Sequence, residues 1–233
     1  MEIVCKDALE YLNGFNDGTL DLIVLDPDYQ EWENFLKQGL IDLSISKLKS
    51  TGNIICFTKQ PFDLALRNTV NPYFRREIVW TFDNGGAWCS HKMPLISTQK
   101  MYWLTKGKDF YFNPRTGVKY SKKTKDFKRS KKVFGDYEAD GKQFTKSEDG
   151  IWIRDHLHYN KPNCGKIPAK PKPLIEIILR CFCQQGGVVC DPFAGSGIVP
   201  LTAEEMGFDA YACDIDDERV NQILDKYFEK EVT

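Results

Sequence analysis

Two carboxylates bracket a proline directly after an apolar run near the start of the chain. The run Leu20–Leu25 is followed by Asp26, Pro27, Asp28 and Tyr29. Such a short apolar run is typical of a strand that is buried on both faces. The proline fixes its own φ and biases the residue before it toward extended backbone, so the backbone conformation of this stretch is restricted. The stretch is therefore either part of a site or a simple acidic turn.

A glycine-rich loop near the end of the chain offers a second set of candidate residues. Asp191–Gly197 reads DPFAGSG between an apolar run and a predicted helix, and Asp214 ends the next apolar run about twenty residues later. In nucleotide-binding α/β folds, such glycines let the backbone approach a ligand and the later acid holds ribose hydroxyls. Because the spacing is not G-x-G-x-x-G, a dinucleotide fits poorly. The two acids favour a ligand with hydroxyls and a positive charge, with a ligand-free strand-to-helix turn as the alternative.

The elements that must position these residues alternate between strands and helices. The predicted strands are Glu2–Cys5, Leu20–Leu25, Asn53–Phe57, Ile78–Phe82, Met101–Thr105, Val188–Cys190 and Ala210–Cys213. The predicted helices are Ala8–Leu12, Phe35–Leu48, Phe62–Val70, Leu174–Cys183 and Ile198–Met206. This alternation predicts a three-layer α/β domain with a mostly parallel sheet.

The composition of the 233-residue chain fits one globular domain that carries an insertion. The N-terminus lacks the apolar core of a signal peptide, and no apolar run approaches the ~20 residues that span a bilayer. We therefore expect a cytoplasmic protein without a membrane partner. The eight cysteines lack the spacing of a zinc site, so we expect buried thiols and no metal.

Positive charge is concentrated in one segment of a chain whose net charge is −1. Between Tyr111 and Lys146 there are eleven basic residues and four acidic ones, with aromatic residues interleaved. Lysine and arginine bind phosphates, and aromatic rings can stack on bases. A solvated charged loop is the alternative interpretation.

The two motifs together resemble those of amino-methylating DNA methyltransferases, which modify adenine N6 or cytosine N4. Asp191–Gly197 with Asp214 resembles their S-adenosylmethionine loop, and Asp26–Tyr29 resembles their catalytic D-P-P-Y motif. The motif order resembles the beta group, in which a target-recognition insertion separates the catalytic half from the cofactor half. The resemblance implies a Rossmann-like methyltransferase fold with a catalytic half at 1–110, a recognition insertion at 111–165 and a cofactor half at 166–233.

The resemblance also implies roles for individual residues. In this family the amino group of a flipped base is held by the Asp side chain and the Pro carbonyl of the motif, here Asp26 and Pro27. Tyr29 would stack on that base. Asp28 replaces the second proline, and we expect its side chain to point away from the base, into solvent or onto a nearby N–H or cation. The implied S-adenosylmethionine ligands are Asp7, Lys172, Asp191, Phe193, Gly195, Gly197 and Asp214.

Three of these cofactor assignments have alternatives. Asp7 could instead be a helix N-cap, and Phe193 could be a core residue. Lys172 lies in a segment that departs from the family's H-P-x-x-K-P motif, with Ile167 where histidine is usual and one additional residue before the K-P.

The resulting hypothesis is a site-specific, S-adenosylmethionine-dependent DNA methyltransferase whose target is adenine N6. Its partner is double-stranded DNA, and a homodimer is left open. The residues expected to bind DNA are Lys122, Lys123, Lys128, Arg129, Lys131 and Lys132. The alternatives are methylation of cytosine N4, methylation of RNA or a free base, and a non-catalytic nucleic-acid-binding subunit on a methyltransferase fold.

Overall fold

The computed structural model describes residues 1–84, 94–118, 150–163 and 168–231. The chain divides into two compact units, one formed by Met1–Asn113 with Arg154–Thr233 and the other by Pro114–Ile153. The smaller unit lies within the span predicted for the recognition insertion. In its described part, the backbone pairs of Thr116 with Ile151 and of Ile153 with Pro114 join its two ends.

The larger unit is built on an eight-stranded sheet with the order β1-β8-β7-β2-β3-β5-β4-β6. The strands are β1 (Glu2–Cys5), β2 (Leu20–Leu25), β3 (Leu48–Thr58), β4 (Phe74–Thr81), β5 (Thr98–Thr105), β6 (His156–His158), β7 (Val188–Asp191) and β8 (Asp209–Asp214). The five strands from β1 to β3 in this order are parallel, whereas β5 is antiparallel to both β3 and β4. The sheet is thus mixed and mostly parallel, as predicted.

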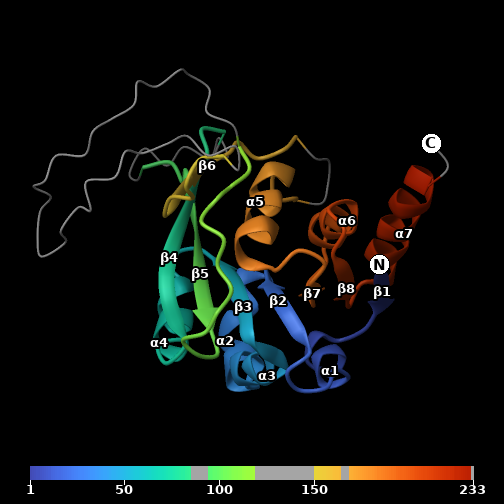
Figure 1. The fold of residues 1–233 in the computed structure, drawn as a ribbon, viewed down its shortest axis with the longest axis horizontal. Helices are drawn as coiled ribbons and strands as arrows, with labels where there is room; N and C mark the ends of the chain where they lie inside the picture. Colours follow the sequence, from blue (N-terminus) through green and yellow to red (C-terminus); the bar gives the residue numbers. More distant parts are fainter. Residues whose placement is uncertain (85–93, 119–149, 164–167, 232–233) are drawn as a thin grey trace, which may run out of the picture. The chain divides into compact units, whose positions relative to one another are not determined.

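Helices cover both faces of this sheet. They are α1 (Ala8–Asn13), α2 (Trp32–Lys37), α3 (Leu40–Lys47), α4 (Asp63–Thr69), α5 (Lys172–Phe182), α6 (Ile198–Glu205) and α7 (Asp217–Glu231), with a 3₁₀ turn η1 (Tyr29–Glu31). Successive residues of β8 separate the two faces: Cys213 packs in the core with α1, α3 and α4, whereas Ala212 packs in the core with α6 and α7. Figure 1 shows α5, α6 and α7 grouped together and α1 to α4 in a second group. The predicted three-layer α/β class is confirmed.

The strand β2 lies at the centre of the fold. Its Ile23 is level with Cys190 of β7 and with Ile54 of β3. All six residues of β2 are buried, because helices cover both faces of the sheet here. The parallel pairing places the carboxyl ends of β1, β8, β7 and β2 at one edge of the sheet.

Some elements differ from the sequence prediction. The helix expected over Phe35–Leu48 is two helices, because Gly39 adopts a φ of +79° between α2 and α3. The apolar spacing continues across this glycine, so periodicity alone could not show the break. β6 and α7 were not predicted, since β6 has three residues and α7 is strongly charged.

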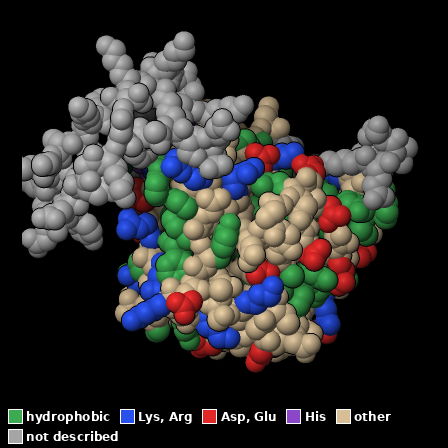
Figure 2. Space-filling view, viewed as in Figure 1, with side chains coloured by type: hydrophobic (Ala, Val, Ile, Leu, Met, Phe, Trp, Pro, Cys, Tyr) green, Lys and Arg blue, Asp and Glu red, His purple; other side chains and the backbone are tan. Residues whose placement is uncertain are grey.

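Charge is unevenly distributed over the larger unit. Figure 2 shows Asp and Glu side chains gathered near α6 and α7, whereas Lys and Arg side chains gather on the side of β4 and β5. In the sequence of these elements, α7 has Asp217 and Glu218 in its first turn. Strand β4 contains Arg75 and Arg76, and β5 contains Lys100. The larger unit is therefore not uniformly acidic.

Cysteines in the described residues are mostly buried. Cys5 is exposed, whereas the other five are buried: Cys56, Cys181, Cys183, Cys190 and Cys213. No three His, Cys, Asp or Glu side chains in this part of the chain are grouped to hold a metal ion. Within the same residues, no helix has both the length and the apolar character needed to cross a bilayer.

Asn53 of β3 joins three parts of the larger unit through its buried amide. Its Oδ1 accepts a hydrogen bond of 2.7 Å from the indole N–H of Trp103 in β5. Its Nδ2 donates to the carbonyls of Tyr111 at 2.9 Å and Phe182 at 2.8 Å. The side chain thereby ties the sheet to the end of α5 and to the segment at Tyr111.

We expect Asn53→Ala to destabilise the protein strongly. The change leaves one buried N–H and two carbonyls without their partner, and each unpaired group costs about 1–3 kcal/mol. The free energy of unfolding in urea should fall by about 3 kcal/mol or more. Asn34→Ala, at an exposed amide in α2, is the control and should change it by less than about 0.5 kcal/mol. Equal losses in both variants would contradict the structural role of Asn53.

Candidate active site

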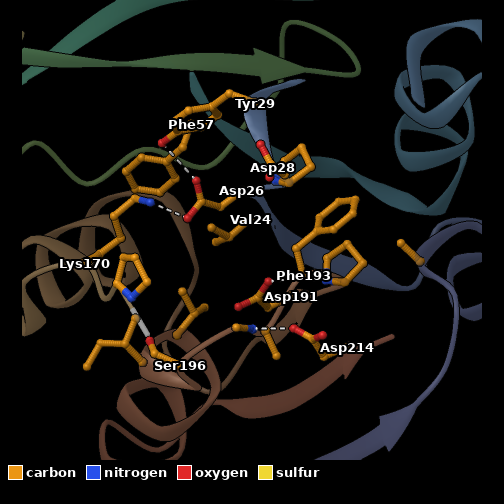
Figure 3. Close-up of a pocket in the computed structure, with 18 of the residues that line it drawn as sticks. Val24, Asp26, Asp28, Tyr29, Phe57, Lys170, Asp191, Phe193, Ser196 and Asp214 are labelled. Atoms are coloured by element: carbon orange, nitrogen blue, oxygen red, sulfur yellow. Dashed lines mark hydrogen bonds and ion pairs between the residues drawn. The ribbon is translucent and has the colours of Figure 1, made fainter. Parts of the chain in front are cut away.

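A cavity of about 640 Å³ opens at the carboxyl edge of the parallel strands. Four of the acids that line it lie at the ends of parallel strands: Asp7 after β1, Asp26 after β2, Asp191 at the end of β7 and Asp214 at the end of β8. These strands are adjacent in the sheet and parallel, so their carboxyl ends meet although the residues lie far apart in sequence. The two predicted motifs therefore face one space (Figure 3).

The Asp26 carboxylate has two partners in the cavity. One oxygen accepts a hydrogen bond of 3.2 Å from the Tyr29 hydroxyl, and the other forms an ion pair with the ammonium of Lys170. The side chain of Asp26 is 28% exposed. Figure 3 shows this carboxylate between Tyr29 and Lys170. Its free lone pairs can accept further N–H donors from a ligand.

Tyr29 serves as a neutral hydrogen-bond donor at this end of the cavity. Its burial, together with the nearby Asp26 carboxylate, raises the pKa of the Tyr29 hydroxyl well above its usual value. The hydroxyl also lies 3.2 Å from Oε1 of Gln99 on β5. The ammonium of Lys59 lies 5.1 Å from the centroid of the Tyr29 ring. The ring is thus held at its hydroxyl end by polar contacts.

Asp28 has a local structural role. Its Oδ1 accepts a hydrogen bond of 3.1 Å from the backbone N–H of Gln30, which caps η1 and orients Tyr29. The expected contact with a nearby N–H is confirmed, although Asp28 also lines the cavity. Its φ of −55° is a value that proline adopts, so the backbone here suits the second proline of the family motif equally well.

Asp191 is the most deeply buried of the four acids. It is 3% exposed, and its Oδ1 accepts a hydrogen bond of 3.0 Å from the backbone N–H of Phe193. Burial raises the pKa of Asp191 to about 8; the Phe193 N–H opposes this rise, and the neighbouring carboxylates Asp26 and Asp214 add to it. A cation placed beside Asp191 would restore its charged form.

Asp214 holds the glycine-rich loop in place. Its Oδ2 accepts a hydrogen bond of 2.8 Å from the backbone N–H of Gly195, and its Oδ1 accepts one of 3.0 Å from the backbone N–H of Asp216. The side chain is also 3.8 Å from the guanidinium of Arg219. Each carboxylate oxygen has a second lone pair, so Asp214 can still accept from hydroxyl groups of a ligand.

The two predicted glycines differ in position. Gly195, with a φ of +52°, lines the cavity, so its backbone can lie close to a ligand. Gly197 does not line it. This residue precedes α6 with a φ of +78°, and a Cβ atom there would lie 2.7 Å from the side chain of Ile223. The structure therefore requires glycine at 197 for packing against α7.

Asp7 and Phe193 line the cavity and also have structural partners. Oδ1 of Asp7 accepts from the backbone N–H groups of Leu9 and Glu10, which makes it the N-cap of α1. The ring of Phe193 packs edge-on against Phe35 at 5.0 Å. Asp7 is therefore both a helix N-cap and a cavity residue, and Phe193 both packs against another ring and lines the cavity.

The segment before α5 contributes a different lysine from the one expected. Lys172 is the first residue of α5, forms an ion pair with Glu205 and does not line the cavity. Lys170 lines it instead. Lys170-Pro171 is the same K-P dipeptide as Lys172-Pro173, so the sequence contained this signal twice.

Further cavity residues carry no motif that sequence analysis could use. They are Lys59, directly after β3; Gln99, near the start of β5; Lys161, after β6; and Arg219, near the start of α7. The basic residues expected to contact DNA, from Lys122 to Lys132, lie outside the described residues.

The cavity thus has two chemically different ends. Asp7, Asp191 and Asp214 form an acidic end that suits a cationic ligand with hydroxyl groups. Asp26 and Tyr29 form the other end, where a carboxylate beside an aromatic ring can accept hydrogen bonds from a flat amino-bearing group.

The chain is similar in sequence to known DNA methyltransferases. The sequence model of the DNA methylase family, which covers N6 and N4 amino-methyltransferases, matches residues 21–225. The type II methyltransferase M1.MboII of Moraxella bovis is 26% identical over 246 residues, which cover 93% of this chain and 92% of that protein. The DNA adenine methyltransferase YhdJ of Escherichia coli (strain K12) is 25% identical over 246 residues, covering 95% and 81% respectively.

A solved structure shows the same fold. The PvuII DNA methyltransferase, described as cytosine-N4-specific, superposes with a TM-score of 0.71 at 15% identity, over 96% of this chain and 84% of that one. Together with the family match over most of the chain, this shows that the protein belongs to the DNA methylase family, whose members transfer a methyl group from S-adenosylmethionine to N6 of adenine or N4 of cytosine in DNA.

Proposed function

We propose that this protein methylates N6 of adenine in double-stranded DNA. The observation that carries the proposal is the shared cavity, which places Asp26 and the loop Asp191–Gly195 in one space. Aspartate at the first motif position favours adenine over cytosine in the resemblance noted from the sequence. The similarity to YhdJ, a DNA adenine methyltransferase, supports the same choice.

The acceptor end would hold the target amino group. An exocyclic amino nitrogen is a weak nucleophile because its lone pair is delocalised into the ring. The Asp26 carboxylate and the Pro27 carbonyl would accept its two hydrogens and favour the more pyramidal nitrogen that develops during transfer. Tyr29 keeps the carboxylate oriented through its hydroxyl and offers its ring to the flipped base.

The acidic end would hold S-adenosylmethionine, whose methyl group on a sulfonium is electrophilic. Buried Asp191 provides a carboxyl that gains from a neighbouring positive charge. Asp214 retains lone pairs for ribose hydroxyls, while its bond to Gly195 fixes the loop against which the ligand lies. Asp7 and Phe193 would complete this wall.

The segment 111–165 would provide target recognition, with its basic residues binding phosphates.

Whether two copies of the chain associate can be measured by sedimentation of the protein with and without DNA.

Expression in a host that lacks DNA methylation tests the proposal directly. Sequencing of the modified bases in host DNA should reveal N6-methyladenine within one short sequence. N4-methylcytosine would instead support the second candidate function, methylation of cytosine N4, which is the activity named for the PvuII enzyme of the same fold. Unmodified DNA from cells that contain the folded protein would support a non-catalytic role.

We expect Asp26→Ala to abolish methyl transfer without loss of cofactor binding. Removal of one preorganised acceptor of this type costs roughly 100-fold or more in rate. Asp28→Asn is the matched control, because an asparagine oxygen can still accept from Gln30 and cap η1. Single-turnover rates on DNA should fall for Asp26→Ala and stay within about threefold of wild type for Asp28→Asn. If both fall equally, the catalytic acid has been misassigned.

Cofactor binding should release a proton from Asp191. In the ligand-free protein the pKa of Asp191 is about 8, above the ordinary 3.8. The folded protein therefore holds this proton more tightly than the unfolded chain does. The resulting contribution to the free energy of unfolding is present at low pH and is lost as the pH rises through about 8. A bound cation favours the ionised carboxyl. Affinity for S-adenosylmethionine should therefore increase from pH 6 to pH 8, by up to about tenfold per pH unit.

Calorimetry in two buffers of different ionisation enthalpy measures the released proton. At about pH 6.5 the wild type should release close to one proton, and Asp191→Asn should lack this release. Binding without proton release by the wild type would show that Asp191 does not face the cation.

Binding to DNA should depend on salt through the basic segment. Neutralisation of Lys122, Lys123, Lys128 and Arg129 together should flatten the plot of log affinity against log salt, by up to about 0.9 for each phosphate that these side chains no longer neutralise. Affinity for the cofactor should not change. An unchanged slope would mean that another surface binds the DNA.

A further inference from the structure

The side chain of Lys170 enters the acceptor end of the cavity and makes two kinds of contact there. Its ammonium donates to Oδ2 of Asp26. The same ammonium lies 4.7 Å from the ring centroid of Phe57 and 5.9 Å from that of Tyr29. The side chain is only 15% exposed, and Figure 3 shows its nitrogen directed at Asp26.

These contacts coincide with those that the proposed function assigns to the target base. The amino group of the base would donate to Asp26, and its ring would lie against Tyr29. An ammonium and an amino group are both N–H donors, and here the ammonium holds the carboxylate oxygen that the Tyr29 hydroxyl leaves available. A base bonded to Asp26 and stacked on Tyr29 would need the volume that the end of Lys170 fills.

The surroundings of Lys170 allow it to leave. Lys59 and Lys161 line the same cavity, and neither forms an ion pair with a carboxylate of the described residues. Burial, and after it the charges of Lys170 and Lys59, lower the pKa of Lys161, so the ammonium of Lys161 is repelled by the other two. DNA would bring phosphates to this group of lysines, and a lysine side chain can change partners by rotation about its own bonds.

We propose that Lys170 occupies the target-base subsite of the DNA-free protein and that the base enters by replacing the Lys170 ammonium on Asp26 with its own amino group. The inference rests on the proposed function of Asp26 and Tyr29. It gives Lys170 a role in selection, because a base without an amino group cannot replace the donor and would leave the carboxylate unpaired.

The test compares two duplexes that contain the recognised sequence. In one, the target base lies opposite an abasic position, so that no base pair must be broken. In the other, the target position itself is abasic, so that no base can enter. Fluorescence anisotropy in the presence of S-adenosylhomocysteine gives a Kd for each duplex. The ratio used is the Kd of the duplex without the target base divided by the Kd of the duplex with it, so a higher ratio means that base entry contributes more to binding.

We expect Lys170→Met to raise this ratio by about threefold or more, because base entry no longer breaks an ion pair. Lys59→Met is the matched control. It removes the same charge from beside the same tyrosine ring but frees no carboxylate, so the ratio should not rise. Lys170→Arg keeps a cationic donor and should not exceed the wild-type ratio.

Three results would overturn the inference. An unchanged ratio in Lys170→Met would show that the side chain is not in the path of the base. A lower ratio would make Lys170 a favourable contact of the base, and an equal rise in Lys59→Met would attribute the effect to net charge. Thermal unfolding checks that Lys170→Met is folded, and Lys170→Gln replaces it if it is not.

Failure of the proposed function would look different. A wild-type protein that methylates no DNA and shows no dependence on the target base would contradict the function itself. A wild-type protein that methylates DNA, with a ratio that Lys170→Met does not raise, would contradict only the role of Lys170.

Discussion

The parallel pairing of β2 with β7, and of β7 with β8, is the constraint on which the site depends. It places the residue after Leu25 beside the ends of two strands that lie more than 160 residues later in the chain. Asp21 of β2 helps to fix this register, because its carboxylate accepts a hydrogen bond of 2.8 Å from the backbone N–H of Val188 in β7. Asp26 meets Asp191 and Asp214 for this reason, although no local sequence signal links it to them.

The same constraint creates an electrostatic problem that the protein resolves in different ways. Three carboxyl groups near one cavity repel one another. Asp191 is buried and, with its pKa near 8, holds a proton at neutral pH. Asp214 is surrounded by backbone N–H groups, and Asp26 is paired with Lys170. A ligand with a positive charge at one end of the cavity would replace the proton on Asp191. A ligand with N–H donors at the other end would replace the Lys170 ammonium on Asp26.

Much of this arrangement could be predicted from the sequence. The strand before Asp26 and the glycine loop before α6 have patterns that depend only on local chemistry, and both were predicted at their observed positions. The break at Gly39 could not be predicted, because the apolar spacing is the same on both sides of it. The charged helix α7 has no such apolar pattern.

The partners of the lysines lie beyond what a pattern can show. Lys170 and Lys172 stand in identical Lys-Pro dipeptides, yet one meets Asp26 and the other meets Glu205. Their directions are set by the start of α5, which the sequence places only to within a few residues. The packing role of Gly197 could not be predicted for a similar reason, since the side chain that excludes a Cβ there comes from α7, a distant part of the chain.

The chemistry of the acceptor end is the central claim, and isotope transfer tests it most directly. DNA would be incubated with the protein and S-adenosylmethionine that carries a deuterated methyl group, then digested to nucleosides and analysed by mass spectrometry. The account predicts deuterated methyl groups on the exocyclic nitrogen of deoxyadenosine. Label on a ring carbon, or no label in DNA when the protein binds both DNA and cofactor, would contradict it.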